Sequence, residues 1–176
     1  MQRCARLVPI VAIVAGSLAC SGYRVVRASE GLGPVKRVAV QTLVNDSYEP
    51  GLDVMVTEAL RREMQKRGGV ELVSDPAAAD LVLSGAVLKV QTNARSFSSI
   101  AFALEYQVDM SLSLQARKPD GTLVAIDPAA LRDWELYLTS SDVEAERRNR
   151  DEALRRLASV LAERVHDSLA DRLLGR

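Results

Sequence analysis

The sequence predicts a two-layer α+β sandwich in which two helices pack on one face of a mixed, mostly antiparallel sheet, in the order β-α-β-β-β-β-α. Two kinds of pattern lead to this prediction. One long stretch alternates apolar and polar residues with a period of two, which is typical of a strand with one buried face and one wet face. Two other stretches carry apolar residues at helical spacing, which is typical of amphipathic helices that cover a sheet.

The stretch from Ala103 to Ala116 is the longest strand that the sequence predicts. Its apolar positions fall on every second residue: Leu104, Tyr106, Val108, Met110, Leu112, Leu114 and Ala116. At about 3.3 Å per residue the strand spans roughly 45 Å, well beyond the common length of about 5–6 residues. Such a strand needs partners on both edges and a cover over its apolar face.

The segments before this strand supply some of its partners. In chain order we expect a strand, a helix, two more strands and an exposed polar loop: 35–43, 52–67, 70–73, 81–92 and 93–100. The helix has one apolar stripe, and Gly68-Gly69 follows it as a C-terminal cap would. Residues 75–80 form a turn between the second and third strands.

The segments after the long strand complete the sheet and its cover. A turn at 118–121 leads to a strand at 123–126, which Asp127-Pro128 interrupts because proline cannot donate to a central ladder. The last strand segment is 132–138. Ser141 and Glu144 fit a capping box, with Ser141 as the N-cap, and a final amphipathic helix runs from there to about Leu174.

The first residues have the pattern of a secretory signal. Arg3 and Arg6 precede a short apolar run, and small residues lead up to Cys20. The run is too short to span a bilayer of about 30 Å. We therefore expect a signal peptide at 1–19, a tether at 20–34 with several glycines, and a single domain at 35–176.

Cys20 is predicted to be a lipidation site. Ser17-Leu18-Ala19-Cys20 resembles the bacterial lipobox, although that motif usually has Leu where this chain has Ser17. Cys20 is the only cysteine left after the signal is removed, so no disulfide can form within the chain. Ser21 follows the cysteine, and by resemblance this favours the periplasmic face of the outer membrane. The alternative is an ordinary secreted protein with a chance cysteine.

Charge and composition do not favour a nucleic-acid-binding protein or an enzyme. Of 23 basic residues, Arg3 and Arg6 lie in the signal, which leaves 21 against 23 acidic residues and no strongly basic footprint. His166 is the only histidine, and we interpret it as a partly exposed helix residue beside Asp167. We expect no catalytic residue, no metal site and no cofactor, because the sequence has no metal-ligand cluster, nucleophile elbow or phosphate loop.

Two surface clusters remain as candidate binding sites. Arg147, Arg148 and Arg150 either form a solvated face balanced by nearby carboxylates or contact a phosphate-like anion. The second cluster combines one arginine with apolar residues in the predicted 93–100 loop and just after it: Arg95, Phe97, Ile100 and Phe102. It is either a docking or lipid-contact site, or a pair of phenylalanines that pin the loop to the sheet.

Several short motifs, in order along the chain, resemble one known family. They are Cys20 to Tyr23, Asn45 to Leu52, Ala79 to Gly85, Glu105-Tyr106 and Tyr137. Together these motifs are similar to those of the lipopolysaccharide-assembly lipoproteins, the LptE family. In that family the first motif begins the mature chain, the second leads into the first helix, and the third starts a strand.

The resemblance implies a function that is not enzymatic. Proteins of the LptE family are outer-membrane lipoproteins that plug the LptD β-barrel, help it to assemble and contact lipopolysaccharide. By position, the family's lipid-contacting basic residues correspond here to Arg95 and to Arg147 or Arg148. Phe97, Ile100 and Phe102 are the candidates for contact with the barrel. Two other functions remain open: a periplasmic adaptor lipoprotein, CsgG-like or LpoB-like, and a secreted enzyme that uses His166.

Overall fold

The fold is the α+β sandwich that the sequence predicts. The computed structural model describes residues 31–97 and 103–175. Two short 3₁₀ helices, η2 and η3, accompany the strands and α-helices of this part of the chain. The elements are β1 Arg37–Val40, β2 Val44–Asn45, α2 Leu52–Arg67, β3 Glu71–Leu72, η2 Pro76–Ala78, β4 Leu81–Val87, β5 Gln91–Phe97, β6 Ala103–Arg117, β7 Leu123–Val124, η3 Pro128–Leu131, β8 Arg132–Leu138 and α3 Val143–Leu174.

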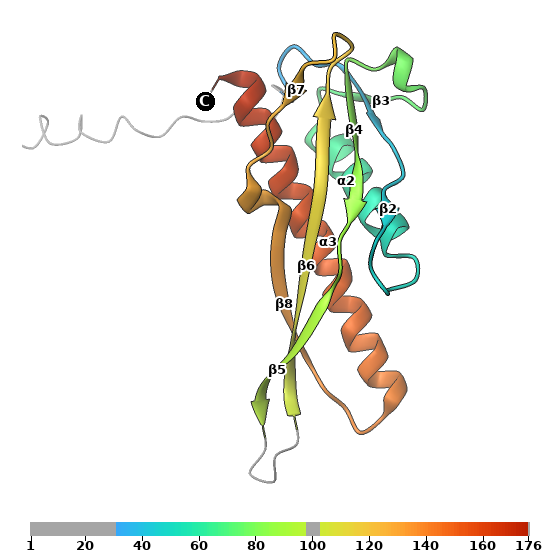
Figure 1. Ribbon diagram of the computed structural model, residues 1–176, viewed down its shortest axis with the longest axis vertical. Coiled ribbons are helices and arrows are strands. Elements are labelled where there is room, and N and C mark those ends of the chain that lie inside the picture. The colour runs from blue at the N-terminus through green and yellow to red at the C-terminus, as the bar shows by residue number, and fades with distance from the viewer. Residues whose placement is uncertain (1–30, 98–102, 176) are drawn as a thin grey trace, which may run out of the picture.

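Strand β6 is the axis of the sheet, as predicted. It pairs antiparallel with β4 and β5 on one edge and with β7 and β8 on the other. The predicted dry face is buried from Val108 to Ala116, whereas Leu104, near the start of the strand, is 47% exposed. Figure 1 looks onto the uncovered face of the sheet, with α2 and α3 behind it.

The parallel part of the sheet lies at the far end from the β5–β6 hairpin. β1 pairs parallel with both β3 and β4, and β2 pairs parallel with β4. Of the predicted strand 35–43 only Arg37–Val40 is a strand, and the short β2 lies just beyond the predicted range. The chain leaves the ladder between them because the Leu43 amide donates to Thr57 Oγ1 of α2, at 3.1 Å, while the Leu43 side chain enters the core.

The prediction for residues 81–100 was wrong in its boundaries. β4 ends at Val87, and Asn93 to Phe97, which we expected in a loop, belongs to β5. This polar segment is a strand because its side chains bond across to β6. Ser96 Oγ lies 3.0 Å from Glu105 Oε2, and Asn93 Nδ2 lies 3.4 Å from Asp109 Oδ2.

The interruption after the predicted strand 123–126 is confirmed. β7 ends at Val124, and Asp127-Pro128 begins the 3₁₀ helix η3. Asp127 Oδ1 caps that helix by accepting from the Ala129 amide at 2.8 Å. β8 then runs over 132–138, as predicted.

Both helices cover the same face of the sheet. α2 has its predicted bounds, and Gly68 follows it with φ 71°. α3 begins one residue later than predicted, so Ser141 is not the N-cap. Asp142 takes that role because its Oδ1 accepts from the amides of Glu144 and Ala145, at 2.9 and 3.4 Å. The core lies between these helices and the sheet.

Gly85 is required where β4 approaches β6. Its φ is +152°, and a Cβ atom at this position would lie 1.9 Å from the Ser113 carbonyl oxygen. We predict that Gly85→Ala lowers the free energy of unfolding by about 3 kcal/mol or more, because backbone would have to move. Gly121→Ala, where the same atom would meet nothing within 4 Å, should cost about 1 kcal/mol. Urea denaturation of both variants checks the difference, and equal effects would contradict it.

Candidate functional site

Arg95 lies on β5 rather than in a loop. Ala94 pairs with Tyr106 and Ser96 with Glu105, so Arg95 is the extra residue of a β-bulge. A bulge redirects a side chain and bends the strand. The Arg95 side chain is exposed, and within the part of the chain that the structure describes no carboxylate forms an ion pair with it.

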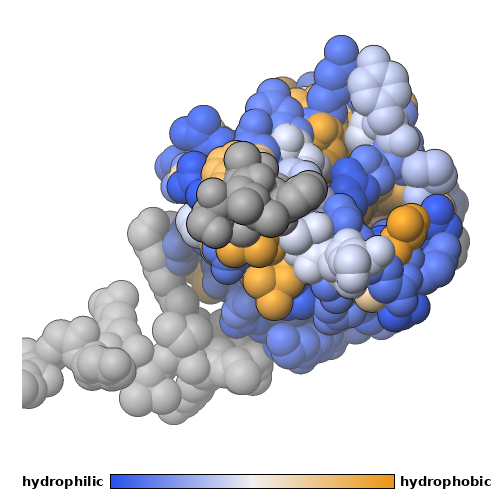
Figure 2. Space-filling view, turned by 90° about the horizontal axis from the view of Figure 1, so that it is seen from below, coloured by the Kyte–Doolittle hydropathy of each residue, from blue (hydrophilic) through white to orange (hydrophobic). Residues whose placement is uncertain are grey.

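The far end of the β5–β6 hairpin is rich in exposed apolar surface. Phe97, the last residue of β5, is 59% exposed, and Leu104 is also largely exposed. Figure 2, seen from this end of the molecule, shows separate apolar patches within a mostly hydrophilic surface. Ile100 and Phe102, the other predicted barrel contacts, lie outside the described residues.

The three arginines at the start of α3 do not form one site. Arg150 binds the Glu49 carboxylate with two nitrogens, one of them 2.6 Å from Glu49 Oε1, and both side chains are only 25% exposed. Arg147 is 68% exposed and lies 3.6 Å from Glu144, and Arg148 is exposed. Arg150 is therefore a structural residue, while Arg147 and Arg148 remain available to a ligand.

The Glu49–Arg150 pair holds the 46–51 loop against α3. The hydrogen bonds from Arg150 keep the pKa of Glu49 below its ordinary value of 4.5. Tyr137 of β8 stacks on Tyr106 of β6 with ring centroids 5.6 Å apart. Burial raises the pKa of Tyr137, and the charge of Arg150 opposes that rise.

Removal of Arg150 should destabilise the fold in a pH-dependent way. We predict that Arg150→Ala lowers the free energy of unfolding by about 2 kcal/mol at neutral pH, because a half-buried carboxylate loses charge-assisted hydrogen bonds. Since the folded-state pKa of Glu49 is lowered, this contribution is complete above pH 4.5 and disappears as pH falls through the folded-state pKa. Urea denaturation across this range checks it. Arg147→Ala is the control and should change little, and a pH-independent loss for Arg150→Ala would be contrary to the prediction.

The interpretation of His166 as a partly exposed residue was wrong. Its side chain is 4% exposed, and Nε2 has no hydrogen-bond partner among the described residues. Nδ1 lies 3.5 Å from the Asp167 carboxylate, so these two neighbours on one helix do meet. The helical stripe alone did not reveal the burial, because α2 packs against this side of α3 and brings Arg67 and Glu63 near the ring.

Burial lowers the pKa of His166 below 6.5. Between pH 6.5 and the lowered value, the unfolded chain binds a proton that the folded chain does not. We predict that the free energy of unfolding of the wild type falls as pH falls through this range. In His166→Leu, residue 166 has no proton to bind and should not contribute to such a fall. The test is the difference in unfolding free energy between the two proteins, measured from pH 7.5 to 5. A difference that stays constant over this range would refute the assignment.

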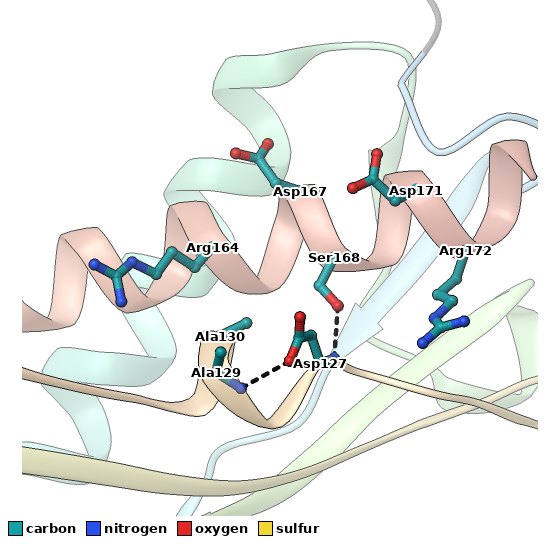
Figure 3. A pocket seen from close by; sticks show the side chains of 8 residues that line it. All are labelled: Asp127, Ala129, Ala130, Arg164, Asp167, Ser168, Asp171 and Arg172. Atoms are coloured by element: carbon teal, nitrogen blue, oxygen red, sulfur yellow. Dashed lines mark hydrogen bonds between the residues drawn. The ribbon is translucent and has the colours of Figure 1, made fainter. Parts of the chain in front are cut away.

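A groove between η3 and the last third of α3 is structural in character. It has a volume of about 550 Å³ and contains Arg164 and Arg172. Figure 3 shows Ser168 and Asp127 facing each other across it, and Ser168 Oγ accepts from the Asp127 amide at 2.7 Å. Asp127 is committed to its cap, and Arg164 binds Asp133 of β8 at 2.9 Å. These polar groups fix η3 and β8 on α3 rather than forming a nucleophile–base pair.

The uncovered face of the sheet is less polar than the sequence suggested. Trp134, Leu136 and Leu138 of β8 are 52%, 37% and 60% exposed, because they point away from α3. The three residues alternate with Asp133, Glu135 and Tyr137 in the sequence, but the alternation alone does not show which face of the sheet they occupy. In the ranges 31–97 and 103–175, no group of three or more acidic, histidine or cysteine side chains could hold a metal ion. No helix in those ranges is long and apolar enough to cross a bilayer.

Comparison with solved structures shows the same fold in two lipoproteins and in a hypothetical protein. A lipoprotein B from Nitrosomonas europaea matches with a TM-score of 0.59 and 11% identity, over 85% of this chain and 91% of that one. The rare lipoprotein B from Shewanella oneidensis matches with a TM-score of 0.52 and 17% identity, over 77% and 98%. The hypothetical protein CT253 from Chlamydia trachomatis has a TM-score of 0.52 and 9% identity, over 80% and 99%.

The sequence comparisons assign the family. A search of curated protein sequences found no match. The family described as "LptE: Lipopolysaccharide-assembly" matches residues 35–169, which is most of the chain and nearly all of the predicted domain. The resemblance stated from the short motifs is thereby confirmed. This protein belongs to the LptE family of lipopolysaccharide-assembly lipoproteins.

Proposed function

We propose that this protein is a non-enzymatic plug inside an LptD-type outer-membrane β-barrel and that it helps the barrel to assemble and to deliver lipopolysaccharide. Family membership is the observation that carries the proposal. The shape supports it: β5 and β6 form a long hairpin that extends past the parallel part of the sheet (Figure 1). The uncovered face of β5 and β6 is lined by amides, hydroxyls and carboxylates, which suits the polar lumen of a large barrel.

The hairpin end would contact both the barrel and the lipid. Phe97 offers an exposed aromatic ring to the barrel wall, and we retain Ile100 and Phe102 as candidates from the sequence. Arg95, Arg147 and Arg148 would bind the phosphate groups of lipopolysaccharide, because a guanidinium binds a phosphate through two hydrogen bonds. The end of β5 and the start of α3 lie toward the same end of the molecule, so one ligand could meet both (Figure 1).

The anchor and the tether are also part of the proposal. Residues 1–19 would be removed, Cys20 would carry the lipid, and residues 20–34 would link it to the domain at the periplasmic face of the outer membrane. Cys20 to Tyr23, the first four residues of the tether, resemble the start of the family's mature chain, with one residue inserted. Stable anchoring by lipid needs more than one acyl chain, and a partner in the membrane would add to it.

Substitution of the lipidated cysteine should release the protein. We predict that Cys20→Ala moves most of the protein from the membrane fraction to the soluble periplasmic fraction, because the lipid anchor cannot form. Fractionation followed by immunoblotting measures this. Cys4→Ala is the matched control, since Cys4 lies within the signal. Retention of the Cys20→Ala protein in a strain that lacks the barrel would exclude lipid anchoring.

Charge reversal should separate lipid binding from folding. We predict that Arg95→Glu combined with Arg148→Glu weakens binding of purified lipopolysaccharide at least tenfold, because two phosphate contacts become repulsions. Arg62→Glu is the control, since Arg62 is exposed on α2 and away from the hairpin. Binding is measured by fluorescence titration, and thermal unfolding confirms that all variants fold. If the double variant binds as tightly as Arg62→Glu, these arginines are only a solvated surface.

A further inference from the structure

The side chains of β8 are distributed unusually between the two faces of the sheet. Its two acidic side chains point toward α3, on the same side as the buried Tyr137: Asp133 lies 2.9 Å from Arg164, and Glu135 lies 3.1 Å from Arg156. Its apolar side chains, Trp134, Leu136 and Leu138, point away from α3 to the uncovered face. In a domain that works alone, the opposite arrangement would bury more apolar surface against the helix. Three large apolar side chains of β8 are therefore open to another molecule on the uncovered face.

The register of the sheet shows what lies beside this apolar row. Residues that pair directly share a face of the sheet. Leu138 pairs with Glu105, Leu136 with Gln107 and Trp134 with Asp109, so an apolar row and an acidic row lie side by side. At the end of the apolar row, Arg132 pairs with Ser111 and is the one basic side chain among these positions.

The acidic row is held in place by its own hydrogen bonds. Asp109 accepts from Gln107 Nε2 at 2.7 Å and from Asn93 Nδ2, while Glu105 bonds to Ser96. These partners are neutral side chains, so they bring no positive charge to the two carboxyl groups on the open face. A lipid phosphate would meet like charge here, whereas lysine or arginine side chains would meet opposite charge.

We propose that the open face of β5, β6 and β8 docks on a protein surface that offers aliphatic or aromatic side chains opposite Trp134, Leu136 and Leu138 and basic side chains opposite Glu105 and Asp109. The inference rests on the proposed function, in which that surface is the inner wall of the LptD-type barrel. On this proposal, different surfaces of the protein bind the barrel and the lipid. The sheet face binds the wall, and the arginines at the hairpin end and at the start of α3 are left for the lipid.

A photo-cross-linking amino acid in place of Leu136 tests the docking face. The full chain is co-expressed with the LptD-type barrel of the same organism, irradiated in cells and analysed by immunoblotting for the barrel. The same amino acid in place of Val54, which is 55% exposed on α2, is the matched control. We expect a barrel cross-link from position 136 that is at least tenfold stronger than from position 54. A cross-link from position 136 only to lipopolysaccharide or to a second copy of the chain would overturn the proposal.

Substitution on the same face gives an independent measure. Trp134→Gln combined with Leu138→Gln should lower the amount of barrel that co-purifies with the tagged protein at least tenfold, and Glu105→Lys with Asp109→Lys should act in the same direction. Val54→Gln combined with Val143→Gln is the control, since both residues are exposed on helices. The variants change exposed or half-buried side chains, and circular dichroism verifies that they fold.

The outcomes separate this inference from the proposed function. If the wild type and the open-face variants retain the barrel equally, the docking face is wrong and the plug remains. If the wild type itself does not retain the barrel, the plug and the docking face fail together. If the wild type retains the barrel and only the open-face variants lose it, the plug and the docking face are both supported.

Discussion

The pairing of β6 on both of its edges is the constraint on which the rest of the structure depends. Four strands bond to this one strand, β4 and β5 on one edge and β7 and β8 on the other. Apolar and polar residues alternate strictly along β6. Because directly paired residues share a face of the sheet, this alternation decides which face of each partner strand meets the helices. The long helix α3 then covers β6 and β8, and α2 covers the parallel strands.

The elements with strong local patterns were predictable, and those set by pairing were not. β6, α2 and most of α3 follow from period-two and period-3.6 patterns. β5 is polar and is a strand because its backbone pairs with β6, a pairing supported by side-chain hydrogen bonds to Asp109 and Glu105. His166 is buried because α2 reaches its side of α3, which a single helix pattern does not show. Likewise, the alternation in β8 is visible in the sequence, but only the register with β6 shows that its apolar residues point outward.

The candidate site was predicted less completely than the fold. The sequence grouped Arg150 with Arg147 and Arg148, yet the structure commits Arg150 to Glu49, a residue 101 positions away. The sequence placed Arg95 near the end of the hairpin, which is correct, but in a loop rather than in a strand. No local pattern in the sequence marks the β-bulge in which Arg95 lies. Distant partners of this kind decide whether an arginine stabilises the fold or stays available to a ligand.

The surfaces of the molecule differ in their chemistry. The helical face buries the core and binds Asp133 and Glu135 of β8, and the sheet face combines an apolar and an acidic row. Arg95 is exposed on the hairpin, and Arg147 and Arg148 are exposed at the start of α3. Such a distribution suits a protein that joins one macromolecule to an anionic lipid without transforming either. In the proposed complex, the partner would cover the large apolar side chains that β8 exposes in the isolated chain.

Co-purification from the outer membrane shows whether this protein is bound inside a β-barrel. The full chain, tagged at its C-terminus, is isolated from outer membranes in mild detergent, and the proteins that accompany it are identified and quantified. For a plug we expect an LptD-type β-barrel at one copy per copy of this chain, retained through a wash in high salt. Recovery of the chain alone, or together with an enzyme of peptidoglycan synthesis or of secretion, would contradict the plug and favour an adaptor of another envelope complex.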